Sequence, residues 1–185
     1  MRFAVGAMAG MMLAAVGAAL PAEAAVTGAG ATGFEVQHMM RIEKPPAAVW
    51  EAIAAPSHWW NPEHTWSKNA GNLSLSAVAG GCWCEKWPGG SVEHMRVVYA
   101  RPPDMLRMVG GLGPLQGMGV HAVLTWTIQR NSDGGTNLTL DYAVGGYSAN
   151  GFVGLAKAVD GVLAEQLSRL QLYLTTGHPN AQATQ

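Results

Sequence analysis

Hydrophobic and polar positions alternate along much of the chain, with the period of strands that bury one face. Residues 34–43 form the first such stretch, and residues 120–128 form the most regular one. Asp133-Gly134-Gly135 then favours a tight turn into a third stretch, residues 136–144. We therefore expect the last two stretches to pair antiparallel. About six short strands, separated by Gly or Pro, are expected between residues 72 and 147.

Two segments have the spacing of helices instead. Pro45 and Pro46 stop the first strand and suit the start of a short helix over residues 47–54. Apolar residues recur every three or four positions over residues 152–174, which predicts a long amphipathic helix that Gly177 and Pro179 end. Its expected polar, solvent-facing side carries Lys157, Asp160, Glu165 and Arg169.

A lone helix of this length must bury its apolar stripe against the apolar face of the sheet. The sequence thus predicts an α+β fold in which a curved antiparallel sheet of about seven strands wraps around the C-terminal helix, with a short helical region after the first strand. A strongly curved sheet does not close completely on a cylinder, so we expect a central apolar cavity able to hold a small molecule.

The two ends of the chain differ from this domain, which we place at residues 34–176. Arg2, an apolar run to Leu20 and the small-x-small sequence Ala22-Glu23-Ala24 have the order of a secretory signal peptide, residues 1–24, cleaved after Ala24. We expect a periplasmic or secreted protein without stable membrane insertion after cleavage. Residues 25–33 read as a flexible leader and residues 177–185 as a disordered tail.

Composition limits the classes of molecule and ion that the protein is expected to bind. The 185 residues carry a net charge of −1 with no basic cluster, so a nucleic acid is not an expected partner. Cys82 and Cys84 are the only cysteines, and an i, i+2 disulfide lies near the upper limit of Cα separation, so free thiols are the expectation. No metal is expected, because this spacing lacks a second ligand pair.

Several short motifs, taken with the element order, resemble the SRPBCC superfamily. They are Val49-Trp50, His58-Trp59-Trp60, the segment AGGCWCE at 79–85 and the tract at 99–104. That group includes START-related lipid carriers, the birch-pollen-allergen fold, polyketide cyclases and activators of a chaperone ATPase. The resemblance implies a helix-grip fold whose cavity binds lipids, polyketides or other hydrophobic molecules. Export departs from the chaperone-activator branch, which needs a cytosolic partner.

The candidate ligand-binding residues are mostly aromatic side chains on the elements expected around the cavity. They are His38, Trp50, Trp59, Trp60, Trp83, Glu85, Tyr99, Leu124, Trp126, Tyr142, Leu155 and Val159. The tryptophans either cover a ligand or plug the core. His38 either orients a ligand or is a core histidine with a backbone or tyrosine partner. His94 and His121 are expected to face solvent, because alternation puts them with Arg96 and Thr125.

Three functions remain open at this level. The leading one is an exported carrier of a small hydrophobic molecule. The second is a polyketide-cyclase-like or hydratase-like enzyme without a cofactor, using Glu85 or His38 for proton transfer. The third is an interaction module in which an exposed Trp59-Trp60 loop docks a protein.

Overall fold

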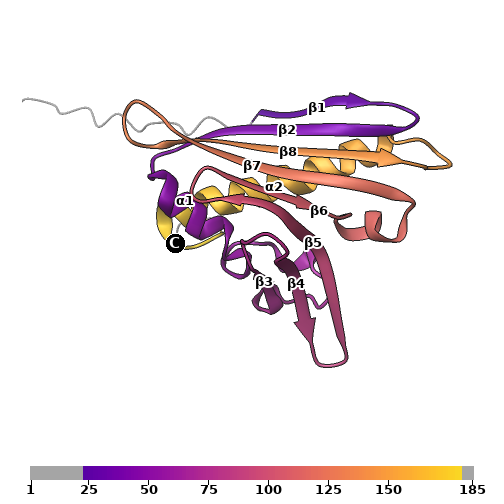
Figure 1. Cartoon of the computed structure of the whole chain (residues 1–185), viewed down its shortest axis with the longest axis horizontal. Helices are drawn as coiled ribbons and strands as arrows, with labels where there is room; N and C mark the ends of the chain where they lie inside the picture. The colour runs from indigo at the N-terminus through magenta and orange to yellow at the C-terminus, as the bar shows by residue number, and fades with distance from the viewer. Residues whose placement is uncertain (1–22, 181–185) are drawn as a thin grey trace, which may run out of the picture.

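The computed structural model describes residues 23–180 as one antiparallel sheet and two α-helices (Figure 1). The eight strands follow one another along the sheet in the order β1-β2-β8-β7-β6-β5-β4-β3. Their bounds are β1 (Glu23–Ala29), β2 (Gly33–Ile42), β3 (Leu73–Leu75), β4 (Cys82–Trp87), β5 (Gly90–Arg101), β6 (Met105–Val109), β7 (Val120–Arg130) and β8 (Thr136–Gly146). Every neighbouring pair is antiparallel, which confirms the predicted sheet class.

The long helix α2 (Val153–Thr176) runs along one face of the sheet, behind β8, β7 and β6 in the view of Figure 1. The short helix α1 (Pro46–Ile53) lies near the C-terminal end of α2. Because β2 pairs with β8, the sheet brings the first and last parts of the domain together beside α2. This arrangement is the predicted α+β helix-grip fold.

The strands β2, β7 and β8 follow the alternation in the sequence closely. Inward residues are buried along all three, and Trp126 of β7 lies opposite Leu140 of β8. The turn between them closes when the Asn131 amide donates to the carbonyl of Gly135 at 3.0 Å. The predicted antiparallel pairing of these two strands is therefore confirmed.

Both helix predictions are also confirmed within a residue or two. Proline occupies the first turn of α1, where its missing N–H costs no hydrogen bond. The helix α2 ends at Gly177, whose φ of 78° is a left-handed conformation that glycine adopts without steric cost. Between α1 and β3 the chain forms three single 3-10 turns, η1 (Pro56–His58), η2 (Pro62–His64) and η3 (Ala70–Asn72).

The N-terminal edge of the sheet differs from expectation. Residues 25–29, predicted as a flexible leader, belong to β1 and pair with β2 in the register Ala25 to Gln37 through Ala29 to Phe34. The sheet consequently has eight strands and not seven. An edge strand can be held by backbone hydrogen bonds alone, so small residues without alternation give no signal for it.

The C-terminal segment also differs. A disordered tail was predicted from residue 177, yet Asn180 folds back and its side-chain oxygen accepts a hydrogen bond from Arg169 on α2. Residues 181–185 lie outside the described residues, as do residues 1–22 of the predicted signal peptide. Over residues 23–180, no helix combines the length and hydropathy that a membrane crossing requires.

Candidate functional site

The site begins with a β-bulge between β4 and β5. Trp83 lies opposite Met95, and Cys84 lies opposite Glu93, so His94 is an extra residue in β5. The extra residue turns two consecutive side chains inward, and His94 and Met95 are both buried. The prediction that His94 faces solvent is therefore wrong, because it assumed uninterrupted alternation.

A glycine next to this bulge allows the neighbouring chain to approach it closely. Gly110 follows β6 with a φ of 144°, and a Cβ placed there would lie 2.6 Å from the carbonyl oxygen of His94. No side chain fits at that distance, so only glycine suits the position.

The imidazole of His94 meets a buried carboxylate. Its Nε2 lies 3.0 Å from Oε2 of Glu85, a residue with no exposed surface. The same carboxylate accepts hydrogen bonds from the backbone amides of Trp66, at 3.0 Å, and Ser67. Glu85 thus ties the loop before β3 to the strand β4.

The electrostatics favour an ionised Glu85 beside a neutral His94. Burial works to raise the pKa of Glu85, but the hydrogen bonds from Ser67, Trp66 and His94 outweigh it and hold the pKa below its ordinary value. Burial lowers the pKa of His94, although the neighbouring carboxylate opposes that shift. Since its oxygens are already occupied by three donors, Glu85 suits positioning better than proton transfer.

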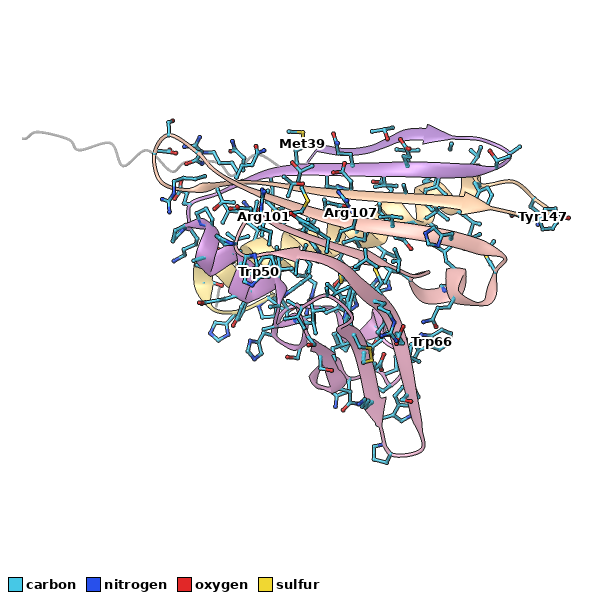
Figure 2. The ribbon with its side chains drawn as sticks, in the orientation of Figure 1. Met39, Trp50, Trp66, Arg101, Arg107 and Tyr147 are labelled. Atoms are coloured by element: carbon cyan, nitrogen blue, oxygen red, sulfur yellow. A yellow bond between two sulfur atoms is a disulfide. The ribbon has the colours of Figure 1, made fainter. Side chains whose placement is uncertain are left out.

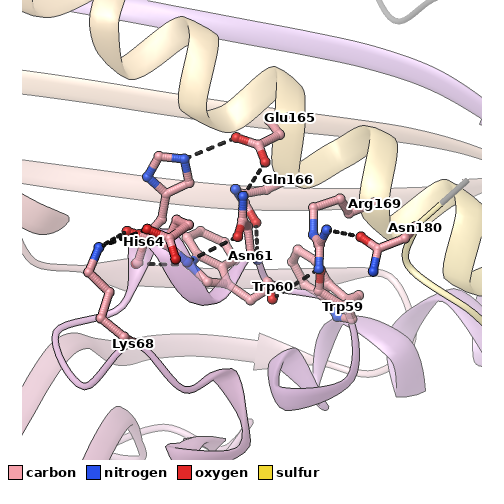
Figure 3. A network of polar contacts seen from close by, with 10 residues as sticks. Trp59, Trp60, Asn61, His64, Lys68, Glu165, Gln166, Arg169 and Asn180 are labelled. Carbon is pink, nitrogen blue, oxygen red and sulfur yellow. Dashed lines mark hydrogen bonds and ion pairs between the residues drawn. The ribbon is translucent and has the colours of Figure 1, made fainter.

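A second feature is residues 56–66, here called the tryptophan strap, which crosses the polar side of α2. Gln166 accepts a hydrogen bond from the backbone amide of Asn61 at 2.8 Å. Nε of Arg169 donates to the carbonyl of Trp59, also at 2.8 Å (Figure 3). Arg169, expected on the solvent-facing side of α2, and the buried Gln166 therefore hold the strap in place.

Glu165 completes this network. It accepts a hydrogen bond from the side-chain amide of Asn61 and lies 3.0 Å from Nε2 of His64. Burial tends to raise the pKa of Glu165, but Asn61, His64 and Arg169 together lower it below its ordinary value. The strap is thus fixed to α2 by one carboxylate, one amide and one guanidinium.

The strap carries two tryptophans into the interior. Trp59 is 2% exposed and Trp60 is 6% exposed, so the predicted exposed Trp59-Trp60 docking loop is wrong. The indole N–H of Trp59 donates to the carbonyl of Ala52 at 2.7 Å, and the Trp60 ring packs edge-on against Trp83 at 4.9 Å. Trp66, at the end of the strap, is the exposed one (Figure 2).

These rings leave little space between the strap, α1 and the sheet. The cavity there has a volume of about 10 Å³ open to the centre of a water molecule. It is lined by Ile53, Pro56, Trp59, Leu75, Trp83, Met108 and Trp126. Such a volume holds about one water molecule, so this cavity does not admit a small molecule in the conformation described. Bulky indoles fill space that the sheet's curvature alone would leave open.

His38 forms a second buried pair on the opposite side of the core. Its Nε2 lies 3.0 Å from Oδ1 of Asp160 on α2, without the geometry of a hydrogen bond. Burial lowers the pKa of His38, while Asp160 opposes that shift. The core histidine that the sequence suggested therefore has a carboxylate partner and not a backbone or tyrosine partner.

The remaining predicted ligand residues divide by position. Leu124, Trp126 and Tyr142 are buried, and Trp50, Leu155 and Val159 are half-buried against the core. Burial raises the pKa of Tyr142 to about 12, and its hydroxyl accepts a hydrogen bond from the Leu112 amide at 3.0 Å. Of the twelve candidates, the cavity brings together Trp59, Trp83 and Trp126.

The prediction that Tyr99 lines a ligand site is wrong, because its side chain is 40% exposed and points away from the interior. Val97 pairs with Met108 and Tyr99 with Arg107, so Val98 is the extra residue of a second bulge in β5. This bulge reverses the alternation again. One strand thus contains both errors, His94 turned inward and Tyr99 turned outward.

The cysteines also differ from expectation. Cys82 and Cys84 are joined by a disulfide across a Cα–Cα distance of 5.4 Å, so the prediction of free thiols is wrong. Their sulfurs and a carboxylate oxygen of Glu93 all lie within 4.8 Å of one another. A disulfide offers no thiolate to a metal, so these groups are not a metal site in this oxidised state.

Comparison with protein families decides the assignment. The family described as polyketide cyclase, dehydrase and lipid transport matches residues 33–175. The chain belongs to this family. The match spans the domain from β2 to the end of α2, and it confirms the SRPBCC resemblance. No curated protein matches the chain significantly.

Solved structures share the family fold. CalU16 from Micromonospora echinospora has a TM-score of 0.55 at 17% identity, covering 84% of this chain and 87% of its own. A protein from Rhizobium leguminosarum has a TM-score of 0.57 at 18% identity, covering 80% and 98%. DynU16, from the dynemicin biosynthetic locus, is 26% identical with a TM-score of 0.53, covering 78% of this chain and 48% of its own.

Proposed function

We propose that this family member binds a small, largely apolar molecule between the tryptophan strap and the sheet. The observation that carries the proposal is the apolar lining of the small cavity between them, which includes Trp59 from the strap and Trp83 and Trp126 from the sheet. Indole faces offer large contact areas to ring-bearing or acyl ligands.

The closed cavity sets a condition on this binding. A volume of about 10 Å³ does not admit a ligand, so the strap must move outward and take Trp59 with it. The strap is the part of the lining best suited to move, because polar contacts to Glu165, Gln166 and Arg169 hold it rather than a strand ladder. The apparent affinity is then reduced by the fraction of molecules that are open.

Trp83 suggests which polar group the ligand carries. Its indole N–H is buried beside the cavity and has no acceptor among residues 23–180. Buried donors normally have a partner, so a ligand oxygen would gain a hydrogen bond there. We propose an apolar molecule with one acceptor, such as a carbonyl or hydroxyl oxygen.

The family assignment supports this proposal at a coarser level, because its description includes lipid transport and polyketide cyclases. DynU16, one of the similar structures, comes from a biosynthetic locus. Both point to small organic molecules as the class of ligand.

The test is a fluorescence titration of the full chain with N-phenyl-1-naphthylamine, a neutral aromatic probe. We expect saturable one-to-one binding. Leu75→Trp adds volume to the lining and should weaken binding about tenfold, since overfilling a packed site costs about 1–3 kcal/mol. Absence of saturable binding to the wild-type protein, or an unchanged affinity in Leu75→Trp, would overturn the proposal.

A matched pair of arginine variants tests the strap. Arg169→Gln removes the contact with the Trp59 carbonyl and should tighten probe binding by favouring the open state. Arg130→Gln changes an exposed arginine at the far end of β7, outside the cavity lining, and should leave the affinity unchanged. Equal affinities in the two variants would mean that the strap does not control access.

We also propose that the protein acts outside the cytoplasm, on the strength of the signal-peptide pattern at residues 1–24. Cleavage after Ala24 falls inside β1 and leaves the pairs from Ala25 onward available to β2. Intact-mass measurement of protein from the periplasm should give a chain that begins at Ala25. Protein found in the cytoplasm with residue 1 retained would contradict export.

A further inference from the structure

The disulfide Cys82–Cys84 lies on the outer face of β4. Trp83 and Glu85 point into the core, whereas the two cysteines alternate with them and are half-buried. The sulfurs are therefore near the surface, within reach of a reactant in solution.

A stabilising role does not account well for this disulfide. A cross-link stabilises a protein mainly by restricting the unfolded chain, and its effect grows with the number of residues in the closed loop. This one encloses a single residue, Trp83. The strand that carries both cysteines, β4, is already held by backbone pairing with β3 and β5.

Charged groups on the neighbouring strand lie opposite the two cysteines. Arg96 pairs with Cys82 in the register, and Glu93 pairs with Cys84. The guanidinium of Arg96 hydrogen-bonds to the Glu93 carboxylate and, at 3.1 Å, to the carbonyl of Gly80. The Glu93 carboxylate lies within 4.8 Å of both sulfurs and would repel a thiolate there, so Arg96, which pairs with that carboxylate, offsets the repulsion. A better-stabilised thiolate leaves a disulfide faster.

We propose that Cys82 and Cys84 are a thiol–disulfide exchange site that accepts two electrons from an accessible dithiol. A thiolate of the dithiol attacks Sγ of Cys84, the Cys82–Cys84 bond breaks, and Cys82 leaves as a thiolate opposite Arg96. The second thiol of the dithiol then attacks the dithiol sulfur that is bonded to Cys84, and Cys84 is released as a thiolate. The reactant becomes a disulfide, and its two protons end on Cys82 and Cys84.

Arg96 acts here by placing a positive charge near the cysteines, without itself reacting. Its removal should slow the reaction and shift the rate-against-pH profile, because the departing Cys82 thiolate loses its stabilising cation. Lysine at the same position keeps the positive charge and should restore part of the rate. A merely structural arginine would not give this pattern.

The experiment treats the oxidised full chain with dithiothreitol at neutral pH without denaturant. Alkylation and intact mass follow the cysteines, and circular dichroism follows the fold. We expect both cysteines to become reduced while the spectrum stays unchanged, with one oxidised dithiothreitol formed per chain. Thiols that appear only when denaturant unfolds the protein would overturn the proposal.

Three arginine variants provide the controls. Arg96→Gln should lower the second-order rate about tenfold, and Arg96→Lys should recover part of that loss. Arg101→Gln alters an exposed arginine on the same strand, paired with Asp104, and should keep the wild-type rate. Equal rates in all three variants would contradict the assigned role of Arg96. Because the reaction is followed at the sulfurs, its outcome does not depend on whether the cavity binds a ligand.

Discussion

The two halves of the sheet differ in how regularly they alternate. In β2, β7 and β8 every second residue is buried, and these strands hold α2 with apolar contacts. In β5 two bulges interrupt the pattern, and this half carries the Glu85–His94 pair, the disulfide and part of the cavity lining. The regular half builds the scaffold, and the irregular half places the groups that have chemistry.

This difference in regularity indicates that a site in such a sheet is found beside its bulges. Bulges re-aim side chains, so polar residues can enter the core without breaking the ladder on both sides. His94 reaches Glu85 in this way. The regular half also contains one buried polar pair, His38 with Asp160, but its partner comes from α2 and not from a neighbouring strand.

The largest expected effect comes from removing the buried carboxylate of the irregular half. Glu85→Ala leaves two backbone amides and His94 without their acceptor, and each unsatisfied buried donor costs about 1–3 kcal/mol. We expect a loss of about 3–5 kcal/mol in the free energy of unfolding. Urea denaturation measures it. Glu93→Ala, a carboxylate 43% exposed on β5, is the control and should stay within about 0.5 kcal/mol. Similar losses of stability in the two variants would contradict the expectation that the buried carboxylate contributes more than the exposed one.

A core truncation in the regular half should cost less and change only stability. Leu138→Ala removes a side chain that is 1% exposed opposite Ile128, outside the cavity lining, and we expect a loss of about 2–4 kcal/mol. Chemical denaturation gives the stability, and the probe titration and the dithiothreitol rate should both match the wild-type protein. A change in either one would show that the two halves are coupled.

The free energy of unfolding should fall in two stages as the pH is lowered. The pKa values of His38 and His94 are lowered on folding, so the unfolded chain takes up protons first and stability falls as the pH drops below about 6.5. The lowered pKa values of Glu85 and Glu165 add stability above pH 4.5 that is lost as these groups protonate. Urea denaturation at pH 8, 6.5, 5.5, 4.5 and 3.5 measures both stages.

A histidine variant separates the contributions to the first stage. His94→Gln should cost about 1–2 kcal/mol at pH 8, because it disturbs a hydrogen bond to a buried charge, and should flatten the dependence between pH 6.5 and 5.5. The control His121→Gln changes an exposed histidine of β7 and should keep the wild-type slope. A stability that stays constant from pH 8 to 5.5 would be inconsistent with two buried neutral histidines.

The smallest effect is expected for an exposed ion pair between the strap and the loop that follows it. Lys68 and Glu63 form an ion pair at 3.2 Å, but their side chains are 62% and 72% exposed. Lys68→Ala should change the free energy of unfolding by no more than about 0.5 kcal/mol, because water screens such pairs. A loss above 1 kcal/mol in the same urea assay would place this pair among the contacts that hold the strap.

The sequence by itself determined the scaffold. Alternation predicted the antiparallel strands from residue 34 onward, helical spacing predicted α2, and the prolines and Gly177 marked where helices begin and end. These features depend on local periodicity, which a linear chain displays directly. The SRPBCC resemblance rested on the same order of elements, and the family match over residues 33–175 confirms it.

Only the tertiary structure decided the site. Whether His94 or Tyr99 points inward depends on two bulges, and a bulge is a matter of register between strands that leaves no mark in the alternation of one strand. The partners Asp160, Glu165 and Arg169 looked like a solvated helix face until the strap and β2 were placed against them. The small cavity has the same origin, because its volume is the space left by tryptophans that come from segments far apart in the chain.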